Sequence, residues 1–223
     1  MAATAHELRA SNPIRLAGLL GAALALCLTA ARAEIPAPSY ADLVAQAESG
    51  DPATDFTALR QAYAVSEGYD GYGAGIEEPF HDMWMAFKAK DCAKAIAKSE
   101  EILKDDYTQS TVHFIRRDCF KQMGDQARAD REESIARGLI HSLLSSGDGK
   151  SAATAYVVVT MEEERLVLSY LELNEERQAL VNEGGHNYDL IEGKNENTGE
   201  AGSAYFNVDA LLAGTARMLQ KAN

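Results

Sequence analysis

A glycine-rich stretch in the second half of the chain has part of the pattern of a phosphate-binding loop. From Ser146 the sequence reads Ser-Gly-Asp-Gly-Lys-Ser, and its end matches the P-loop, in which backbone amides at a helix N-terminus hold phosphate groups. The P-loop also needs an earlier glycine, where this chain has Leu144, and a strand before the loop rather than after it. The stretch therefore predicts a helix end at Gly147 and an Asp-Gly turn that leads into a strand.

A catalytic site is a second kind of chemistry that these residues could support. Asp148, Lys150 and Ser151 lie in the stretch, and His186 could join them at the mouth between two parts of the chain. Such a set could bind or hydrolyse a small molecule if a nucleophile meets an acid or base there. The histidines lack a zinc spacing, and the three acids at 162–164 splay around a helix. We therefore assign no catalytic residue, metal ligand or cofactor, and we keep an enzyme as the alternative.

The first 33 residues have the pattern of a secretory signal peptide. Arg9 and Arg15 supply a positive start, and an apolar run of 13 residues follows over 16–28. Ala-Arg-Ala then fits the small-x-small rule for cleavage between Ala33 and Glu34. The apolar run is too short for a comfortable membrane span of about 20 residues. We predict a periplasmic or secreted protein, with an uncleaved anchor as the alternative.

The chain is acidic, with a formal net charge of −13 at pH 7. Removal of residues 1–33 takes away three basic residues and one acidic residue, which makes the net charge −15. This charge argues against binding to nucleic acid or to an anionic membrane surface. A strong net charge also keeps a protein soluble, and so the charge of this chain does not identify a partner. The remaining 190 residues suffice for one or two domains with real cores.

The two cysteines after the signal peptide, Cys92 and Cys119, could form a disulfide. An even number of cysteines in an exported chain favours a bridge. Cys92 would begin the second helix of a hairpin, and Cys119 would lie near the end of the following helix, so both would lie at the same end of two antiparallel neighbours. We predict that they are bridged, and small buried thiols are the competing interpretation.

The first half of the exported chain reads as helices with an internal period. Asp91 and Ala95 recur 34 residues later as Asp125 and Ala129, and each aspartate opens a helix. Thirty-four residues is the period of tetratricopeptide repeats, which are helix-turn-helix units. About one and a half repeats are present, so other elements must cover their ends. The predicted helices cover residues 40–48, 55–67, 79–89, 91–104, 109–122 and 125–145.

A glycine-rich loop separates the early helices from this repeat. Residues 68–75 hold four glycines and two tyrosines, which is typical of a loop rather than a strand. Tyr69 and Tyr72 could stack on a ligand or pin the loop to the helical core, and pinning is the interpretation that we adopt.

The second half of the chain predicts a small sheet domain with the order β-α-β-β-β-α. Residues 155–160 read as a buried strand, and Thr160 with Glu163 predicts a capping box at the start of the next helix. Three further elements complete the domain: a hairpin that turns at Gly184-Gly185, a strand over 204–208 and a helix capped by Asp209. The chain is therefore predicted to be an α+β protein, in which tetratricopeptide-like antiparallel helical hairpins precede the sheet domain.

Several short segments carry a family resemblance through their order and spacing. They are Asp55-Phe-Thr-Ala-Leu-Arg-Gln-Ala-Tyr63, Tyr69-Asp-Gly-Tyr72, Ser146-Gly-Asp-Gly-Lys-Ser151, Thr154-Ala-Tyr-Val-Val-Val159, Gly185-His-Asn-Tyr-Asp189 and Tyr205-Phe-Asn-Val208. Together they span most of the exported chain, which resembles a bacterial family catalogued as a domain of unknown function (number 4919). The resemblance implies an exported or envelope protein with a helical-repeat-like front. It implies no activity, substrate, cofactor or site residue.

These observations favour a non-enzymatic module of the cell envelope that binds another protein or a peptide. Helical repeats offer a concave groove, and a groove lined by exposed tyrosine and methionine would favour binding. A deep pocket with convergent polar groups would favour an enzyme, and helices that only stabilise the sheet would leave neither. The predicted organisation is a signal peptide over 1–33, a tail or linker over 34–53, a helical domain over 54–146 and a sheet domain over 147–223.

Overall fold

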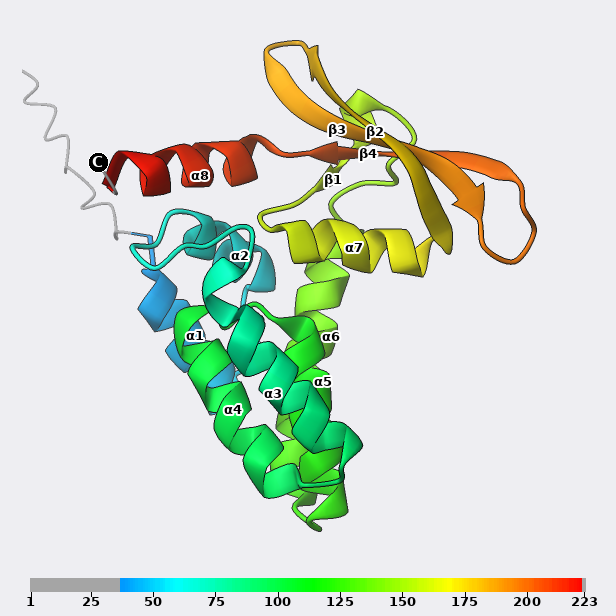
Figure 1. The fold of residues 1–223 in the computed structure, drawn as a ribbon. Coiled ribbons are helices and arrows are strands. Elements are labelled where there is room, and N and C mark those ends of the chain that lie inside the picture. The colour runs from blue at the N-terminus through cyan, green and yellow to red at the C-terminus, as the bar shows by residue number, and fades with distance from the viewer. Residues whose placement is uncertain (1–36, 222–223) are drawn as a thin grey trace, which may run out of the picture. The chain divides into compact units, whose positions relative to one another are not determined.

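The computed structural model describes residues 37–221, and the predicted signal peptide with its cleavage site lies outside them. The described residues belong to one compact unit with eight α-helices and four strands, which confirms the α+β class (Figure 1). The helices are α1 (Tyr40–Ser49), α2 (Phe56–Ala64), α3 (Glu77–Lys88), α4 (Cys92–Asp105), α5 (Ser110–Gln122), α6 (Gln126–Leu144), α7 (Met161–Tyr170) and α8 (Asp209–Lys221). The strands are β1 (Tyr156–Val157), β2 (Leu173–Glu183), β3 (His186–Asn195) and β4 (Ala201–Asn207). Within residues 37–221, the helices all lack the combination of length and apolar character that a membrane span requires.

The predicted repeat is present as two helical hairpins, α3 with α4 and α5 with α6 (Figure 1). Asp91 and Asp125 cap α4 and α6, because each carboxylate accepts a backbone N–H three residues further on, at 3.1 and 3.0 Å. The turn before Asp125 needs a left-handed residue, and Gly124 supplies it with φ 78°. The local signals that predict these helices from sequence therefore also end and begin them in the structure.

The four strands form one mixed sheet in the order β1-β4-β3-β2. β2 and β3 are an antiparallel hairpin whose turn is Gly184-Gly185, and the two glycines have φ values of 62° and 85°. A two-residue turn that matches the strand twist needs positive φ at both positions, which glycine adopts without steric cost. β4 pairs antiparallel with β3, and β1 pairs parallel with β4. The predicted hairpin and the β-α-β-β-β-α order are both confirmed.

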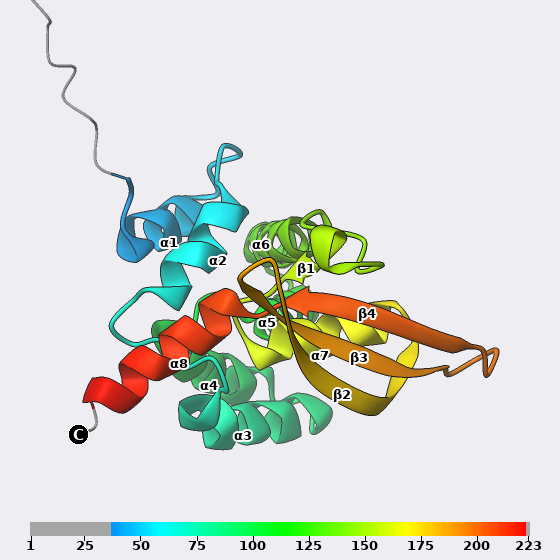
Figure 2. The ribbon, with the colours of Figure 1, turned by 90° about the horizontal axis from the view of Figure 1, so that it is seen from above.

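The two faces of the sheet have different covers. Ile191 of β3 and Phe206 of β4 lie on the face that packs against Val167 of α7. On the opposite face, Tyr188 packs against Ala152, which belongs to a short 3₁₀ turn before β1. In Figure 2 the connection between β3 and β4 reaches beyond the helices, so α7 covers only part of the sheet.

The helical and sheet parts of the unit share a core. Tyr63 of α2 and Leu143 of α6 lie in one cluster of buried side chains with Val159 and with Leu211 of α8. The change from helix to strand follows residue 144, close to the boundary predicted at residue 146. The two parts are therefore joined by side-chain packing as well as by the chain.

The first predicted strand is much shorter than expected. The sequence predicts a strand over 155–160, but β1 contains only two residues. The neighbouring backbone groups bond to side chains instead: the Val159 N–H donates to Glu163 at 2.7 Å, and the Val157 carbonyl accepts from Arg60 at 2.6 Å. The predicted burial is nevertheless confirmed for Val159, whose side chain is fully buried.

Two helix starts in the sheet part differ in detail from their predictions. Thr160 caps α7 as predicted, because its hydroxyl accepts the Glu163 N–H at 3.3 Å. The predicted capping box is wrong, because the Glu163 carboxylate bonds to groups other than the Thr160 N–H. Asp209 is the first residue of α8 rather than its cap, and its carboxylate accepts from His186 and Asn187.

One of the two tyrosines in the glycine-rich loop pins it to the core. The Tyr69 side chain is buried, and its hydroxyl donates to the Val159 carbonyl at 2.6 Å. Tyr72 is exposed instead. Pinning is therefore confirmed for Tyr69, whereas the Tyr72 side chain is available at the surface.

Candidate functional site

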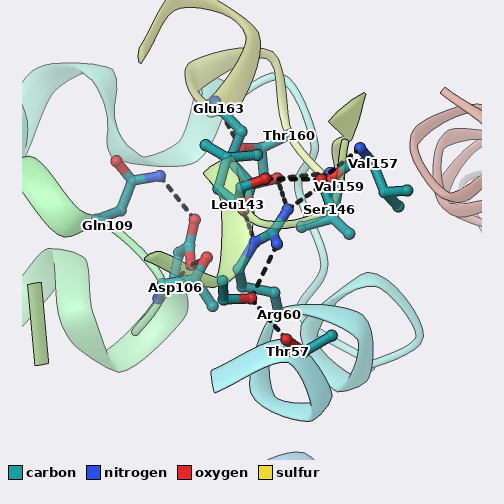
Figure 3. A network of polar contacts seen from close by, with 12 residues as sticks. Thr57, Arg60, Asp106, Gln109, Leu143, Ser146, Val157, Val159, Thr160 and Glu163 are labelled. Carbon is teal, nitrogen blue, oxygen red and sulfur yellow. Dashed lines mark hydrogen bonds and ion pairs between the residues drawn. The ribbon is translucent and has the colours of Figure 1, made fainter. Parts of the chain in front are cut away.

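A buried ion pair joins the helical part to the sheet part (Figure 3). Arg60 of α2 contacts Glu163 of α7, with its Nε 2.6 Å from Oε1 and its Nη2 2.8 Å from Oε2. The same guanidinium donates to the Ser142 hydroxyl on α6 at 3.1 Å and to the Val157 carbonyl at 2.6 Å. The side chains of Arg60 and Glu163 are 4 % and 9 % exposed, so both charges are largely removed from water.

Further hydrogen bonds complete this network. The Glu163 carboxylate accepts a third hydrogen bond from the Val159 N–H, and the Ser142 hydroxyl bonds to Thr57 at 2.9 Å. A buried ion pair is tolerated only when hydrogen bonds satisfy both charges, and this pair meets that condition. We interpret the network as a structural joint between α2, α6, α7 and the segment around β1.

An open groove of about 740 Å³ lies between α1, α4 and α6. Its apolar lining is aromatic and aliphatic and includes Tyr40, Val44, Leu103, Tyr107 and Ile135. Its charged lining comprises Glu48, Glu100, Lys104, Arg116, Arg128, Arg131 and Glu132. The groove therefore combines apolar and charged surface.

A second hollow of about 320 Å³ continues this groove past the end of α1. Arg131 and Ile135 of α6 line both hollows, so the two lie next to each other. Gly50, which ends α1 with φ 76°, and Phe56 line the second hollow. Because α1 has 10 residues, it is about 15 Å long, which matches about four or five residues of an extended chain.

Three charged side chains form the polar floor of the groove. His113 of α5 lies with its Nδ1 2.6 Å from Oε2 of Glu132 and with its Nε2 3.0 Å from the Tyr107 carbonyl. Arg116 donates from Nε to Oε1 of Glu132 at 2.7 Å and from Nη1 to the Ser99 hydroxyl at 2.9 Å. His113 is fully buried, whereas Arg116 and Glu132 line the groove. We call His113, Arg116 and Glu132 the floor triad.

The geometry determines the charge of the floor triad. Both ring nitrogens of His113 face acceptors, a carboxylate and a carbonyl, so both carry a proton when Glu132 is ionised. Burial alone would raise the pKa of Glu132, but the hydrogen bonds and charges of His113 and Arg116 outweigh it and hold that pKa below its usual range. The triad therefore carries two positive charges and one negative charge.

Tyr107 adds an unused hydroxyl to the floor. The residue is 6 % exposed, and its ring packs edge-on against His113 with the ring centroids 4.8 Å apart. Its hydroxyl makes no hydrogen bond within residues 37–221. Burial, followed by the charge of Glu48, raises the pKa of this hydroxyl well above its usual range, so it stays protonated and can donate.

Comparison with protein families matches residues 38–217 to the family described as Domain of unknown function (DUF4919). The chain belongs to this family. The match runs from before α1 into α8, so the groove, the buried ion pair and the sheet all lie within the DUF4919 region. Neither the search of curated proteins nor the search of solved structures found a match. The family resemblance of the sequence is thereby confirmed, and the family description assigns no activity.

The four residues predicted for a junction site form separate local contacts in the DUF4919 region. Lys150 Nζ lies 3.1 Å from the Asp148 carboxylate, and Ser151 bonds within its own turn. His186 Nδ1 lies 2.6 Å from the carboxylate of Asp209 at the start of α8. In the described part of the chain, no hydrogen bond or ion pair joins His186 to the other three. None of the grooves that we describe is lined by these four residues.

A third groove, of about 420 Å³, lies at the junction but uses other residues. The glycine-rich loop, the start of α3 and the start of α7 enclose it. Tyr72 and Phe80 supply aromatic surface, and Glu162 and Arg165 supply charge. Burial raises the pKa of Glu162 above its usual range. The sequence signal for this groove is Tyr72 of the glycine-rich loop.

Cys92 and Cys119 lie together in the core of the helical part. Both are buried in one cluster of side chains, and both are free thiols. Burial, followed by the hydrogen bond to Cys92, raises the pKa of the Cys119 thiol to about 12. The two sulfur atoms are therefore neighbours, at the same end of α4 and α5. The disulfide itself stays a prediction.

A second buried acid lies between α7 and the sheet. Glu164 is 1 % exposed, and its Oε1 has no hydrogen-bond partner among residues 37–221. Burial, followed by the charge of Asp189, raises the pKa of Glu164 to about 8. Across residues 37–221, no three or more His, Cys, Asp or Glu side chains are placed to hold a metal ion. Glu164 lines none of the grooves that we describe, so we interpret it as a pH-sensitive packing contact.

Sequence reasoning misses the residues of the groove. His113 and Arg116 stand three positions apart on a predicted helix, and Glu132 lies on the next helix. The only signal is that His113 adjoins the apolar stripe of its helix, next to Val112. The charge of the floor triad appears only once the two helices are packed together.

Proposed function

We propose that this protein is an exported, non-enzymatic module that binds a peptide, or an extended segment of another protein, in the groove along α1. The groove carries the proposal, because its main hollow of about 740 Å³ combines an aromatic and aliphatic lining with charged side chains, and a second hollow of about 320 Å³ lies next to it. Protein interfaces likewise combine apolar and polar surface.

The form of the groove favours a chain-like ligand over a small molecule. The two hollows extend along one helix, and the residues that line them come from several helices. Tyrosine lines the groove at Tyr40 and Tyr107, but Tyr40 is half-buried and Tyr107 is buried, whereas the prediction is for exposed tyrosines. The exposed methionines Met85 and Met123 line none of the described grooves, so methionine contributes nothing there.

Export to the periplasm or out of the cell is the second part of the proposal. The signal-peptide pattern over 1–33 supports it, with its basic start, apolar run and small residues before Glu34. The partner that we propose is therefore a protein or peptide of the cell envelope. The strong negative charge of the chain argues against nucleic acid.

Retention of short random peptides tests the binding function. Residues 34–223 would be immobilised, exposed to a peptide pool and washed, and the retained peptides would be identified by mass spectrometry. We expect wild-type protein to retain a subset of the pool. Ala45→Trp should abolish this retention, because Ala45 is exposed on α1 and lines the groove, which the indole would fill.

Ala216→Trp is the matched control, since Ala216 is exposed on α8 and lines none of the described grooves. It should leave retention unchanged. Failure of wild-type protein to retain peptides, or retention that survives Ala45→Trp, would refute the proposal.

The alternative function is small-molecule binding or hydrolysis at the junction between the helical and sheet parts. The observation in its favour is the third groove, which brings Tyr72, Glu162 and Arg165 together. A small molecule that co-purifies with wild-type protein and is lost from Tyr72→Ala would support this alternative. The same molecule retained by Tyr72→Ala would count against it.

A further inference from the structure

We infer that the groove along α1 recognises an acidic side chain, the carboxylate of a glutamate or aspartate, on the peptide that it binds. The inference rests on the proposed function and adds the chemical class of the ligand. The anchor for the carboxylate consists of Arg116, Tyr107 and Arg131, which line the same hollow.

The first argument is the surplus positive charge of the floor triad. His113 and Arg116 share one carboxylate, that of Glu132, so two positive charges face one negative charge. Ser99 is the other partner of Arg116, and it is neutral. A part-buried charge acts through a lower dielectric than an exposed one, so the surplus is felt strongly within the groove.

The second argument is the balance of the other charges around the groove. Arg128 is neutralised by its own helix cap, since it lies 2.7 Å from the carboxylate of residue 125. Lys104 and Arg131 equal Glu48 and Glu100 in number, and none of these four has an ion-pair partner in the described part of the chain. The residues around the groove therefore have the surplus positive charge of the floor triad, although the whole chain has a net charge of −13.

The third argument is that the floor has unused hydrogen-bond donors. Arg116 uses Nε and Nη1 on its partners within the protein, and its Nη2 makes no hydrogen bond within residues 37–221. The Tyr107 hydroxyl is also unused within residues 37–221, and Tyr107 lines the same hollow as Arg116 and Arg131. A carboxylate has two oxygens that can accept such donors at once, and these charge-assisted bonds are strong.

The depth of the anchor favours a side chain over a chain end. The Arg116 side chain is 16 % exposed and Tyr107 is 6 % exposed, so the anchor lies below the open path along α1. That path continues past Arg131 into the second hollow. A backbone can therefore pass on both sides while a glutamate or aspartate reaches down, whereas a chain end would leave one hollow empty.

The test uses four pools of short random peptides, made with or without Asp and Glu and with a free or an amidated C-terminus. Wild-type protein should retain the pools that contain Asp and Glu about tenfold more than those that lack them, whether amidated or not. If the protein retained the pools with a free C-terminus and not the amidated pools, whether or not they contain Asp and Glu, the carboxylate would belong to the chain end. That result would overturn the assignment to a side chain. Equal retention of all four pools would overturn the inference and leave the proposed function standing. No retention of any pool would overturn both.

Two variants test whether the carboxylate of the peptide binds at the anchor. Tyr107→Phe removes a hydroxyl that makes no hydrogen bond within residues 37–221, and Arg131→Gln removes an exposed charge, so neither should unfold the protein. Each should lower retention of the acidic pools several-fold and leave the acid-free pools unchanged. Arg137→Gln is the matched control, because Arg137 lies on the same helix, pairs with Glu133 and lines none of the described grooves. Acid selectivity that survives both Tyr107→Phe and Arg131→Gln would overturn the anchor.

Discussion

The two buried charge networks of this DUF4919 protein have opposite characters. In the joint, Arg60 and Glu163 balance one positive and one negative charge, and surrounding groups complete their hydrogen bonds. In the floor triad, His113 and Arg116 share the single carboxylate of Glu132, and Nη2 of Arg116 has no hydrogen-bond partner within residues 37–221.

The difference separates a structural role from a candidate binding role. A buried polar group without a partner costs free energy, so a network that only holds the fold together is expected to be complete, as the joint is. The floor triad is incomplete only where it meets the groove, which solvent or a ligand can fill. Surplus charge and spare donors at that place are what a binding site needs, and removing them should affect binding more than folding.

The largest expected effect is at the joint. Arg60→Met leaves the Glu163 carboxylate buried without its counter-charge, so it should lower the free energy of unfolding by about 3–5 kcal/mol. Urea denaturation followed by circular dichroism measures this. The control is Arg137→Met, whose exposed ion pair should contribute less than about 1 kcal/mol. Equal effects of the two substitutions would show that the joint is not the structural element that we describe.

The next effect concerns α4 and α5, because α5 carries His113 and Arg116 of the floor triad. A disulfide between Cys92 and Cys119 would tie α4 to α5 and should raise the free energy of unfolding by about 3 kcal/mol. Protein exported by its own leader should have a mass lower by two hydrogen atoms, and reductant should lower its stability. Cys92→Ser should show no response to reductant. Two free thiols in the exported protein would contradict the predicted bridge.

A third effect distinguishes the carboxyl of Glu164, which lies between α7 and the sheet, from the ionised carboxyl of Glu132 in the floor triad. Because the folded state raises the pKa of Glu164 to about 8, it holds a proton that the unfolded chain releases near pH 4.5. The stability from this proton is complete below the unfolded pKa and is lost as the pH rises through about 8. Alkaline pH should therefore weaken the packing of α7 on the sheet.

Glu164→Gln keeps the shape of the side chain and removes its titration. Between about pH 5 and pH 9, wild type should lose at least about 2 kcal/mol more stability than the variant, as measured by urea denaturation at each pH. Glu176→Gln is the control, because its exposed carboxylate lies on β2 and pairs with Lys194, and its pH profile should follow that of wild type. Parallel pH profiles for wild type and Glu164→Gln would exclude Glu164 as the titrating group.

The smallest effect compares one tyrosine hydroxyl from each region. Tyr69→Phe removes a buried hydrogen bond to the Val159 carbonyl and should lower the free energy of unfolding by about 1–2 kcal/mol. Tyr107→Phe removes no hydrogen bond within residues 37–221 and should change it by less than about 0.5 kcal/mol. Denaturant titration of both variants measures the contrast. A larger loss for Tyr107→Phe would mean that its hydroxyl stabilises the fold.

The parts of the fold that follow from sequence are those set by nearby residues. Asp91 and Asp125 act as caps three residues from the amides that they bind, and Gly184-Gly185 fixes its hairpin through its own backbone. The 34-residue period marks the helical hairpins for the same reason. Each of these signals is complete within a short window of the chain.

The parts that sequence does not predict depend on distant partners. β1 contains only two residues, and the Val157 carbonyl within it accepts a hydrogen bond from Arg60, which lies far away in the chain on α2. The charge of the groove depends on which acid pairs with which base, and Glu132 meets His113 only through the packing of α5 against α6. From a single sequence such residues can be assigned to helices, but the pairs that they form across helices cannot be predicted.

The most direct test of the central claim is to locate bound peptide on the protein. Methyl-labelled protein would be titrated with peptides retained from the acidic pool, and the nuclear magnetic resonance shifts of Val44, Leu103 and Ile135, which line the groove, would be followed. We expect these signals to move together with peptide concentration, while those of Val167 and Ile191 beneath the sheet stay in place. Shifts confined to the sheet, or to the junction groove, would contradict the claim that the groove along α1 is the binding site.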